Sequence, residues 1–161
     1  MKTIPIDASE AGHRLAVLQG DYLFESGLEP DLKNAERIYV MLWRFQAEIY
    51  NGGIWQFFTN STGAYSPFIC DALQTVGADD MAATMREAII NSGPGTPWHM
   101  ATTNSTSILD APIAVREFVY KLNDQLSPHL DNLSLLLFSY MLKHRYEFRV
   151  SDDFWSEVPL Q

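Results

Sequence analysis

Residues 31–53 read D-L-K-N-A-E-R-I-Y-V-M-L-W-R-F-Q-A-E-I-Y-N-G-G, and this stretch predicts the central helix of the fold. Asp31 follows Pro30 and is expected to cap the helix. Apolar residues then recur every three or four positions along one stripe: Ala35, Ile38, Leu42, Phe45 and Ile49. Others widen the apolar surface toward a second face: Tyr39, Trp43 and Tyr50. Such a helix is typical of a domain centre, and Gly52 and Gly53 are expected to end it.

Helical spacing also predicts the elements on either side of this helix, and no stretch alternates as a strand would. Toward the N-terminus, a helix is expected over residues 9–26, with Ser9 as its N-cap. Asp79 or Asp80 is expected to cap one of the later helices. The predicted C-terminal elements are a short segment over 54–59, helices over 66–76, 79–90, 112–126 and 129–149, and an irregular loop over 93–111. The sequence therefore predicts an all-α fold of six to seven helices in a single domain, residues 1–161.

The formal net charge of −9 favours basic partners and disfavours direct binding to nucleic acid or to anionic membranes. Most of the imbalance lies at the two ends of the chain. Residues 1–31 carry a net charge of −4 and residues 150–161 carry −3, whereas the middle carries only −2. These ends supply the residues expected to form an acidic partner-binding surface: Asp21, Glu25, Glu29, Asp31, Asp152, Asp153 and Glu157.

Cys70 is the only cysteine, so no internal disulfide is expected and a reducing, cytoplasmic location is favoured. Its apolar neighbours predict a buried and inert thiol. The first residues contain no run typical of a signal peptide. The longest apolar stretch, residues 133–142, is too short and too polar to span a bilayer, so no membrane anchor is expected.

The sequence contains no recognisable catalytic motif: G-x-S-x-G, G-x-x-x-x-G-K-[ST] and G-x-G-x-x-G are all missing. Glu10 and His13 have the E-x-x-H spacing of a di-iron ligand pair, but no second copy follows. His144 and Glu147 are expected to form a packed or salt-bridged pair. The basic residues near the end of the last predicted helix, Lys143, Arg145 and Arg149, are expected to complement its dipole. We therefore expect no enzyme activity, no metal and no cofactor.

Residues 48–63, E-I-Y-N-G-G-I-W-Q-F-F-T-N-S-T-G, form the most distinctive segment. The glycines allow a tight turn, after which aromatic residues bury against the preceding helix. Gln56 and Asn60 are then expected to bond backbone groups left open at the turn. This interpretation gives a structural role to each motif residue: Glu48, Asn51, Gly52, Gly53, Gln56, Phe57, Phe58, Asn60 and Gly63.

The pattern N-G-G-x-x-Q-F-F-x-N-x-x-G resembles the signature of a bacterial protein family, mostly uncharacterised, that includes a DNA mimic. A later pattern supports the resemblance, which covers about residues 30–150: Leu137, Tyr140, His144, Glu147 and Phe148. The resemblance implies an all-α fold. For the mimic member it implies a homodimer whose acidic surface imitates duplex phosphates and occupies the DNA-binding face of a transcriptional regulator.

Two functional hypotheses follow, one of protein binding and one of ligand binding. In the first, the acidic residues at the chain ends gather into one face that binds a basic DNA-binding protein. An accessory role of the toxin–antitoxin or immunity type is not separable from this. In the second, a cleft near the N-G-G turn and the 93–111 loop holds a small ligand or substrate. Its expected lining is Glu48, Asn51, Gln56, Asn60, Trp98 and His99.

Overall fold

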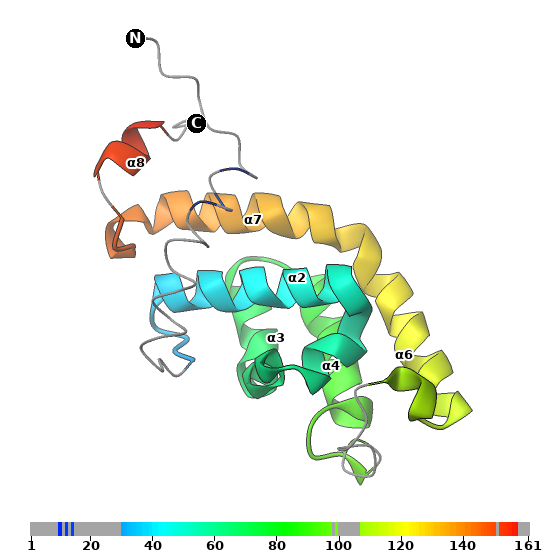
Figure 1. Ribbon diagram of the computed structural model, residues 1–161. Helices are drawn as coiled ribbons and strands as arrows, with labels where there is room; N and C mark the ends of the chain where they lie inside the picture. Colours follow the sequence, from blue (N-terminus) through cyan, green and yellow to red (C-terminus); the bar gives the residue numbers. More distant parts are fainter. Residues whose placement is uncertain are drawn as a thin grey trace.

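The central helix of the computed structural model is α2 (Ala35–Thr59), with other helices packed on both of its sides (Figure 1). The structure describes residues 10, 12, 14, 30–97, 99, 107–150 and 152–157. The helix expected over residues 9–26 lies outside these residues, except for three helical positions within it. Much of the 93–111 loop lies outside them too.

Two layers of helices enclose α2 (Figure 1). On one side lie α3 (Ser66–Thr75) and α4 (Asp79–Ser92). On the other, α6 (Ile113–Leu126) leads through the 3-10 turn η3 (Ser127–His129) into α7 (Leu130–Lys143), which runs alongside α2. The remaining elements are η1 (Ser61–Tyr65), η2 (Ile108–Asp110), η4 (Arg145–Glu147) and α8 (Asp152–Glu157). The described residues contain helices and no strand, so the predicted all-α class is confirmed.

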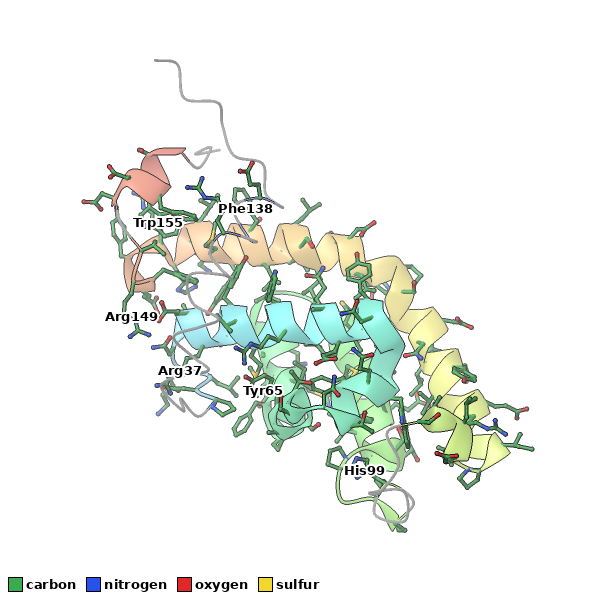
Figure 2. The ribbon with its side chains drawn as sticks, viewed as in Figure 1. Arg37, Tyr65, His99, Phe138, Arg149 and Trp155 are labelled. Atoms are coloured by element: carbon green, nitrogen blue, oxygen red, sulfur yellow. The ribbon has the colours of Figure 1, made fainter. Side chains whose placement is uncertain are left out.

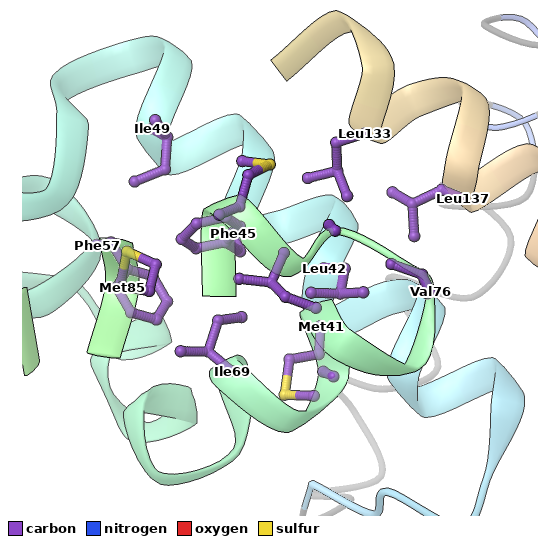
Figure 3. Close-up of a cluster of buried hydrophobic side chains, with 14 of the residues drawn as sticks. Met41, Leu42, Phe45, Ile49, Phe57, Ile69, Val76, Met85, Leu133 and Leu137 are labelled. Carbon is purple, nitrogen blue, oxygen red and sulfur yellow. The ribbon is translucent and has the colours of Figure 1, made fainter. Parts of the chain in front are cut away.

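The apolar stripe of α2 is buried as predicted, because neighbours cover it from both layers. Leu42 and Phe45 are fully buried, and Figure 3 shows them facing side chains of α3, α4 and α7. Each such side chain stabilises the fold by roughly 1.5–3 kcal/mol. Gln46 fixes α7 against α2, because its amide donates both to the Leu130 carbonyl and to the Ser134 hydroxyl, each at 2.7 Å. Tyr50 was expected to widen the apolar surface of this central helix, but it is 55% exposed and does not belong to the core.

Three predicted helix ends differ from the structure. Asn34, not Asp31, caps α2, because its side chain accepts a hydrogen bond from the Arg37 backbone. Ala78 is the N-cap of α4, and the two aspartates expected to cap it lie in its first turn, where they favour the helix dipole. The helix expected over 129–149 ends at Lys143, and its last residues form η4 and an extended segment instead. Among the described residues, no helix is both long and apolar enough to cross a bilayer.

The two glycines end the first half of α2 as expected, because two helical segments meet at a kink at Gly53 and the second segment continues to Thr59. The bend lies at Gly53, whose φ of 75° and ψ of −166° occur almost only in glycine. Asn123 of α6 packs directly on this residue, and its side-chain oxygen accepts a hydrogen bond from the Ile54 N–H at 2.9 Å. The bend therefore turns the second half of α2 back toward the core and seats it on α6.

Replacing Gly53 with alanine tests the bend. The new Cβ would lie 2.5 Å from the Asn123 amide nitrogen, in addition to the unfavourable backbone angles. We expect Gly53→Ala to lower the free energy of unfolding by about 3 kcal/mol. Gly95→Ala is the control, because Gly95 also has positive φ but no atom within 4 Å of its Cβ position; it should lose about 1 kcal/mol. Urea denaturation measures both, and equal losses would contradict the role of Asn123.

Candidate functional site

Three polar residues of the 48–63 motif converge on one carboxylate, that of Glu48. Its Oε2 accepts hydrogen bonds from the side-chain amides of Gln56 at 2.7 Å and Asn60 at 2.9 Å. Its Oε1 accepts from the hydroxyl of Thr62 at 3.2 Å. Glu48 precedes the bend of α2 and its three partners follow it. The carboxylate therefore ties the two halves of the bent helix and η1 together.

This network corrects the roles expected for Gln56 and Asn60, whose side chains donate to Glu48 rather than to open backbone groups. The other motif residues allow close packing around the network. A Cβ at Gly52 would overlap the Gln56 side chain, and one at Gly63 would lie 2.5 Å from the Phe58 carbonyl oxygen. Phe57 is fully buried and packs edge-to-face on Phe45, with ring centroids 5.2 Å apart. The motif thus connects the two halves of α2, and we call Glu48 with its partners Gln56, Asn60 and Thr62 the joint.

A hollow of about 330 Å³ lies on the outer side of this joint, between the bend of α2 and the α6–α7 connection. Its lining includes Tyr50, Asn51, Gly52, Asp124 and Leu130. The Tyr50 hydroxyl donates to the Asp131 carboxylate at 2.5 Å. This hydrogen bond, with some burial and the nearby negative charge, raises the pKa of Tyr50 to about 12.

This hollow contains only one of the described residues expected from the sequence to line a ligand cleft. Among the described residues predicted to line it, only Asn51 does so. Glu48, Gln56 and Asn60 bond one another within the joint, and His99 is not part of the lining. Trp98 lies outside the described residues. The sequence located the hollow near the N-G-G turn but missed Asp124 and Leu130, because they lie on helices distant in the sequence.

The predicted acidic surface can be placed for only some of its residues. Asp152 and Asp153 are exposed in the first turn of α8. Asp31 lies before α2 and is 4.0 Å from the Arg37 guanidinium. Figure 2 shows Arg37 and Arg149 at the same end of the molecule as α8, so positive charges lie among these carboxylates. The others are not described: Asp21, Glu25 and Glu29 lie outside the described residues, and Glu157 ends α8 with its side chain not described.

An ion pair that the sequence analysis missed, between the buried Glu36 and the half-exposed Arg149, holds the C-terminal segment in place. The Glu36 carboxylate is 1% exposed and accepts from the Arg149 side chain at 2.6 and 2.9 Å and from its backbone N–H at 3.2 Å. Phe148 packs edge-to-face on Tyr39 beside it. The dipole role expected for Arg149 was wrong, because this residue lies beyond α7 and bonds the start of α2.

The structure also shows the surroundings of His144, Glu147 and Cys70, which the sequence analysis discussed. His144 Nδ1 lies 2.7 Å from a carboxylate oxygen of Glu147, which confirms the expected pair, and this hydrogen bond lowers the pKa of Glu147. The expectation of a buried Cys70 was wrong, since its side chain is only partly buried, but this burial still raises the pKa of the thiol. A raised pKa disfavours the nucleophilic thiolate. Within the described ranges, no group of three or more His, Cys, Asp and Glu side chains is arranged to hold a metal ion.

The fold and the joint together define the class: an all-α protein built around a central helix whose bend is tied by a half-buried carboxylate. The chain belongs to the DMP19-like protein family, whose profile matches residues 30–144. No curated protein and no solved structure matches the chain. The matched range includes the joint and the hollow, whereas α8 lies beyond it.

The joint is tested by comparing two substitutions of Glu48. Leucine removes the acceptor of two amide donors, one part-buried and one exposed, so Glu48→Leu should lower the free energy of unfolding by about 2 kcal/mol. Glutamine can place its oxygen where Oε2 lies and donate its amide to Thr62, so Glu48→Gln should lose about 1 kcal/mol or less. Glu117→Leu, at an exposed position, is the control. Chemical denaturation that ranked Gln and Leu as equal would contradict the network.

The pKa of Tyr50 gives a second test. Because it is raised above the ordinary 10.0, the Asp131 contact stabilises the fold fully below pH 10, and this contribution is lost as the pH rises toward 12. We expect the ¹³Cζ resonance of Tyr50, assigned with Tyr50→Phe, to show a neutral phenol at pH 10. Asp131→Asn should lower the pKa toward its ordinary value, since the negative charge is removed. A wild-type Tyr50 that is half ionised at pH 10 would contradict the contact.

Proposed function

We propose that this chain is an acidic protein-interaction module that acts as a DNA mimic and occupies the DNA-binding face of a basic DNA-binding protein, such as a transcriptional regulator. The family match supports a role of this kind. The observation that carries the proposal is a set of exposed carboxylates that form no ion pair within the described part of the chain. They are Asp71, Asp79, Asp80, Glu87, Glu117, Asp124, Asp131, Asp152 and Asp153.

The amount of this charge matches that of a short duplex segment. B-DNA carries one charge per about 1.7 Å of axis, so nine carboxylates correspond to roughly four to five base pairs. Helices α8 and α6 lie at opposite ends of α7 (Figure 1). Asp152 and Asp153 of α8 therefore lie beyond one end of α7, and Asp124 of α6 lies beyond the other. A helix of 14 residues is about 21 Å long, close to six base pairs of B-DNA. A homodimer would double the net charge to −18 and extend the imitated segment, in the cytoplasm where such regulators act.

A binding role is favoured over a catalytic one by how the motif's polar groups are used. Glu48, Gln56 and Asn60 satisfy one another within the joint. A catalytic acid or base must instead be available to a substrate. The proposal therefore assigns the motif to the fold and partner recognition to the surface.

The proposal is tested by competition with DNA. The full chain is immobilised, and proteins captured from a native lysate at about 50 mM salt are challenged with duplex DNA, or with a mononucleotide at equal phosphate concentration and ionic strength. We expect a DNA-binding protein to elute with the duplex and not with the mononucleotide. Its affinity should fall at least about tenfold between 50 and 200 mM salt. A partner that binds duplex DNA and this chain at the same time would refute mimicry.

The residues predicted on α8 have their own control. The triple variant Asp152→Asn, Asp153→Asn, Glu157→Gln removes three charges, as does Asp71→Asn, Asp79→Asn, Asp80→Asn on α3 and α4. If α8 contacts the partner, the first variant should bind the eluted protein about tenfold more weakly and the second should change affinity less. Equal affinities for both variants would show that α8 is not the contact.

A further inference from the structure

One face of α6 carries apolar and acidic side chains that are left exposed. Val119, Leu122 and Leu126 point into the core and are fully buried. On the opposite side, Ile113 is 64% exposed and Tyr120 is 46% exposed. Two exposed carboxylates, Glu117 and Asp124, lie on the same side of the helix. Successive spacings of four, three and four residues place four side chains on one helix face: Ile113, Glu117, Tyr120 and Asp124. We call these four residues the α6 stripe.

The α6 stripe ends at the hollow beside the bend of α2, because Asp124 belongs to both. This hollow attracts positive charge for several independent reasons. Asp124 lines it, and Asp131 lies at its edge, bonded to the Tyr50 hydroxyl. The half-exposed Tyr50 ring offers an aromatic face to a cation. The first half of α2 also ends here at Gly52, so the negative end of its dipole lies at the hollow.

Extending the proposed function and resting on it, we propose that the α6 stripe and the hollow bind an amphipathic basic helix of the partner, with one arginine entering the hollow. The negative charge of this surface is complementary to a basic helix and therefore favours this occupant. The stripe and the hollow's lining contain acidic but no basic side chains. The bases of α6, Arg116 and Lys121, lie on either flank of the stripe. A guanidinium combines the flat shape that stacks on an aromatic ring with the donors that a carboxylate requires.

The apolar part of the α6 stripe explains why the occupant is a helix rather than a free amino acid. Ile113 and Tyr120 lie two turns apart, which matches side chains two turns apart on a helix laid along them. Their exposed area adds apolar burial to the charge contact, as in helix-in-groove recognition. The hollow of about 330 Å³ has room for a long side chain at the end of such a helix.

The test uses defined peptides, so it does not depend on identifying the native partner. A 15-residue helical peptide with leucine and arginine on one face is titrated into the ¹⁵N-labelled full chain, beside a peptide with glutamate in place of arginine. We expect saturable shifts at residues 49–53 and 113–131 with the arginine peptide only. Asp124→Asn should weaken this binding about fivefold, and the matched control Asp71→Asn less than about twofold. Both positions are exposed, and unchanged thermal unfolding confirms the fold.

Several outcomes would overturn the inference while leaving the proposed function to its own DNA-competition test. These are shifts centred on α8, equal binding of the glutamate peptide, or no difference between Asp124→Asn and Asp71→Asn. A further contrary outcome is a dimer in sedimentation velocity that Tyr120→Glu dissociates, since a second copy would then cover the stripe.

Discussion

The bend of α2 at Gly53 is the constraint on which the rest of the structure depends. A helix of 25 residues without a bend would be about 37 Å long and would carry its second half away from the core. The positive φ of Gly53 turns that half back, so that Phe57 and Phe58 bury beneath the first half. Glu48 then ties the two halves of α2 together by accepting hydrogen bonds from residues beyond the bend. The position of η1, and through it that of α3, follows from this joint.

Periodicity in the sequence was enough to predict the fold class and the core face of α2. The buried residues of that face, such as Leu42 and Phe45, repeat at helical spacing, and this signal is local. The two glycines marked the right place for a change of direction. The kink at Gly53 separates two helical segments there, as the glycines indicated. They could not show what packs against the kink, because Asn123 lies 70 residues away on α6.

The contacts that close the fold could not be predicted for the same reason. Glu36 and Arg149 are ordinary charged residues in the sequence. They form an ion pair only because the segment before α8 returns to the start of α2. Whether the acidic residues gather on one face is likewise a property of the packing. The structure places Asp31 beside Arg37 and leaves Asp124 at the hollow, although the sequence analysis favoured the first and passed over the second. The net charge favoured a basic partner, whereas the positions of the individual carboxylates follow only from the fold.

These observations divide the molecule into an internal joint, which lies within the family match, and exposed carboxylates, to which we assign recognition. The hydrogen bond from the Ile54 N–H to Asn123 joins the kink of α2 to α6. Amide hydrogen exchange at Ile54 in the wild type and in Asn123→Ala therefore tests the central claim. The account predicts slow exchange that becomes at least about tenfold faster in the variant, with the Leu137 amide of α7 little changed. Equally fast exchange of Ile54 in both proteins would contradict it.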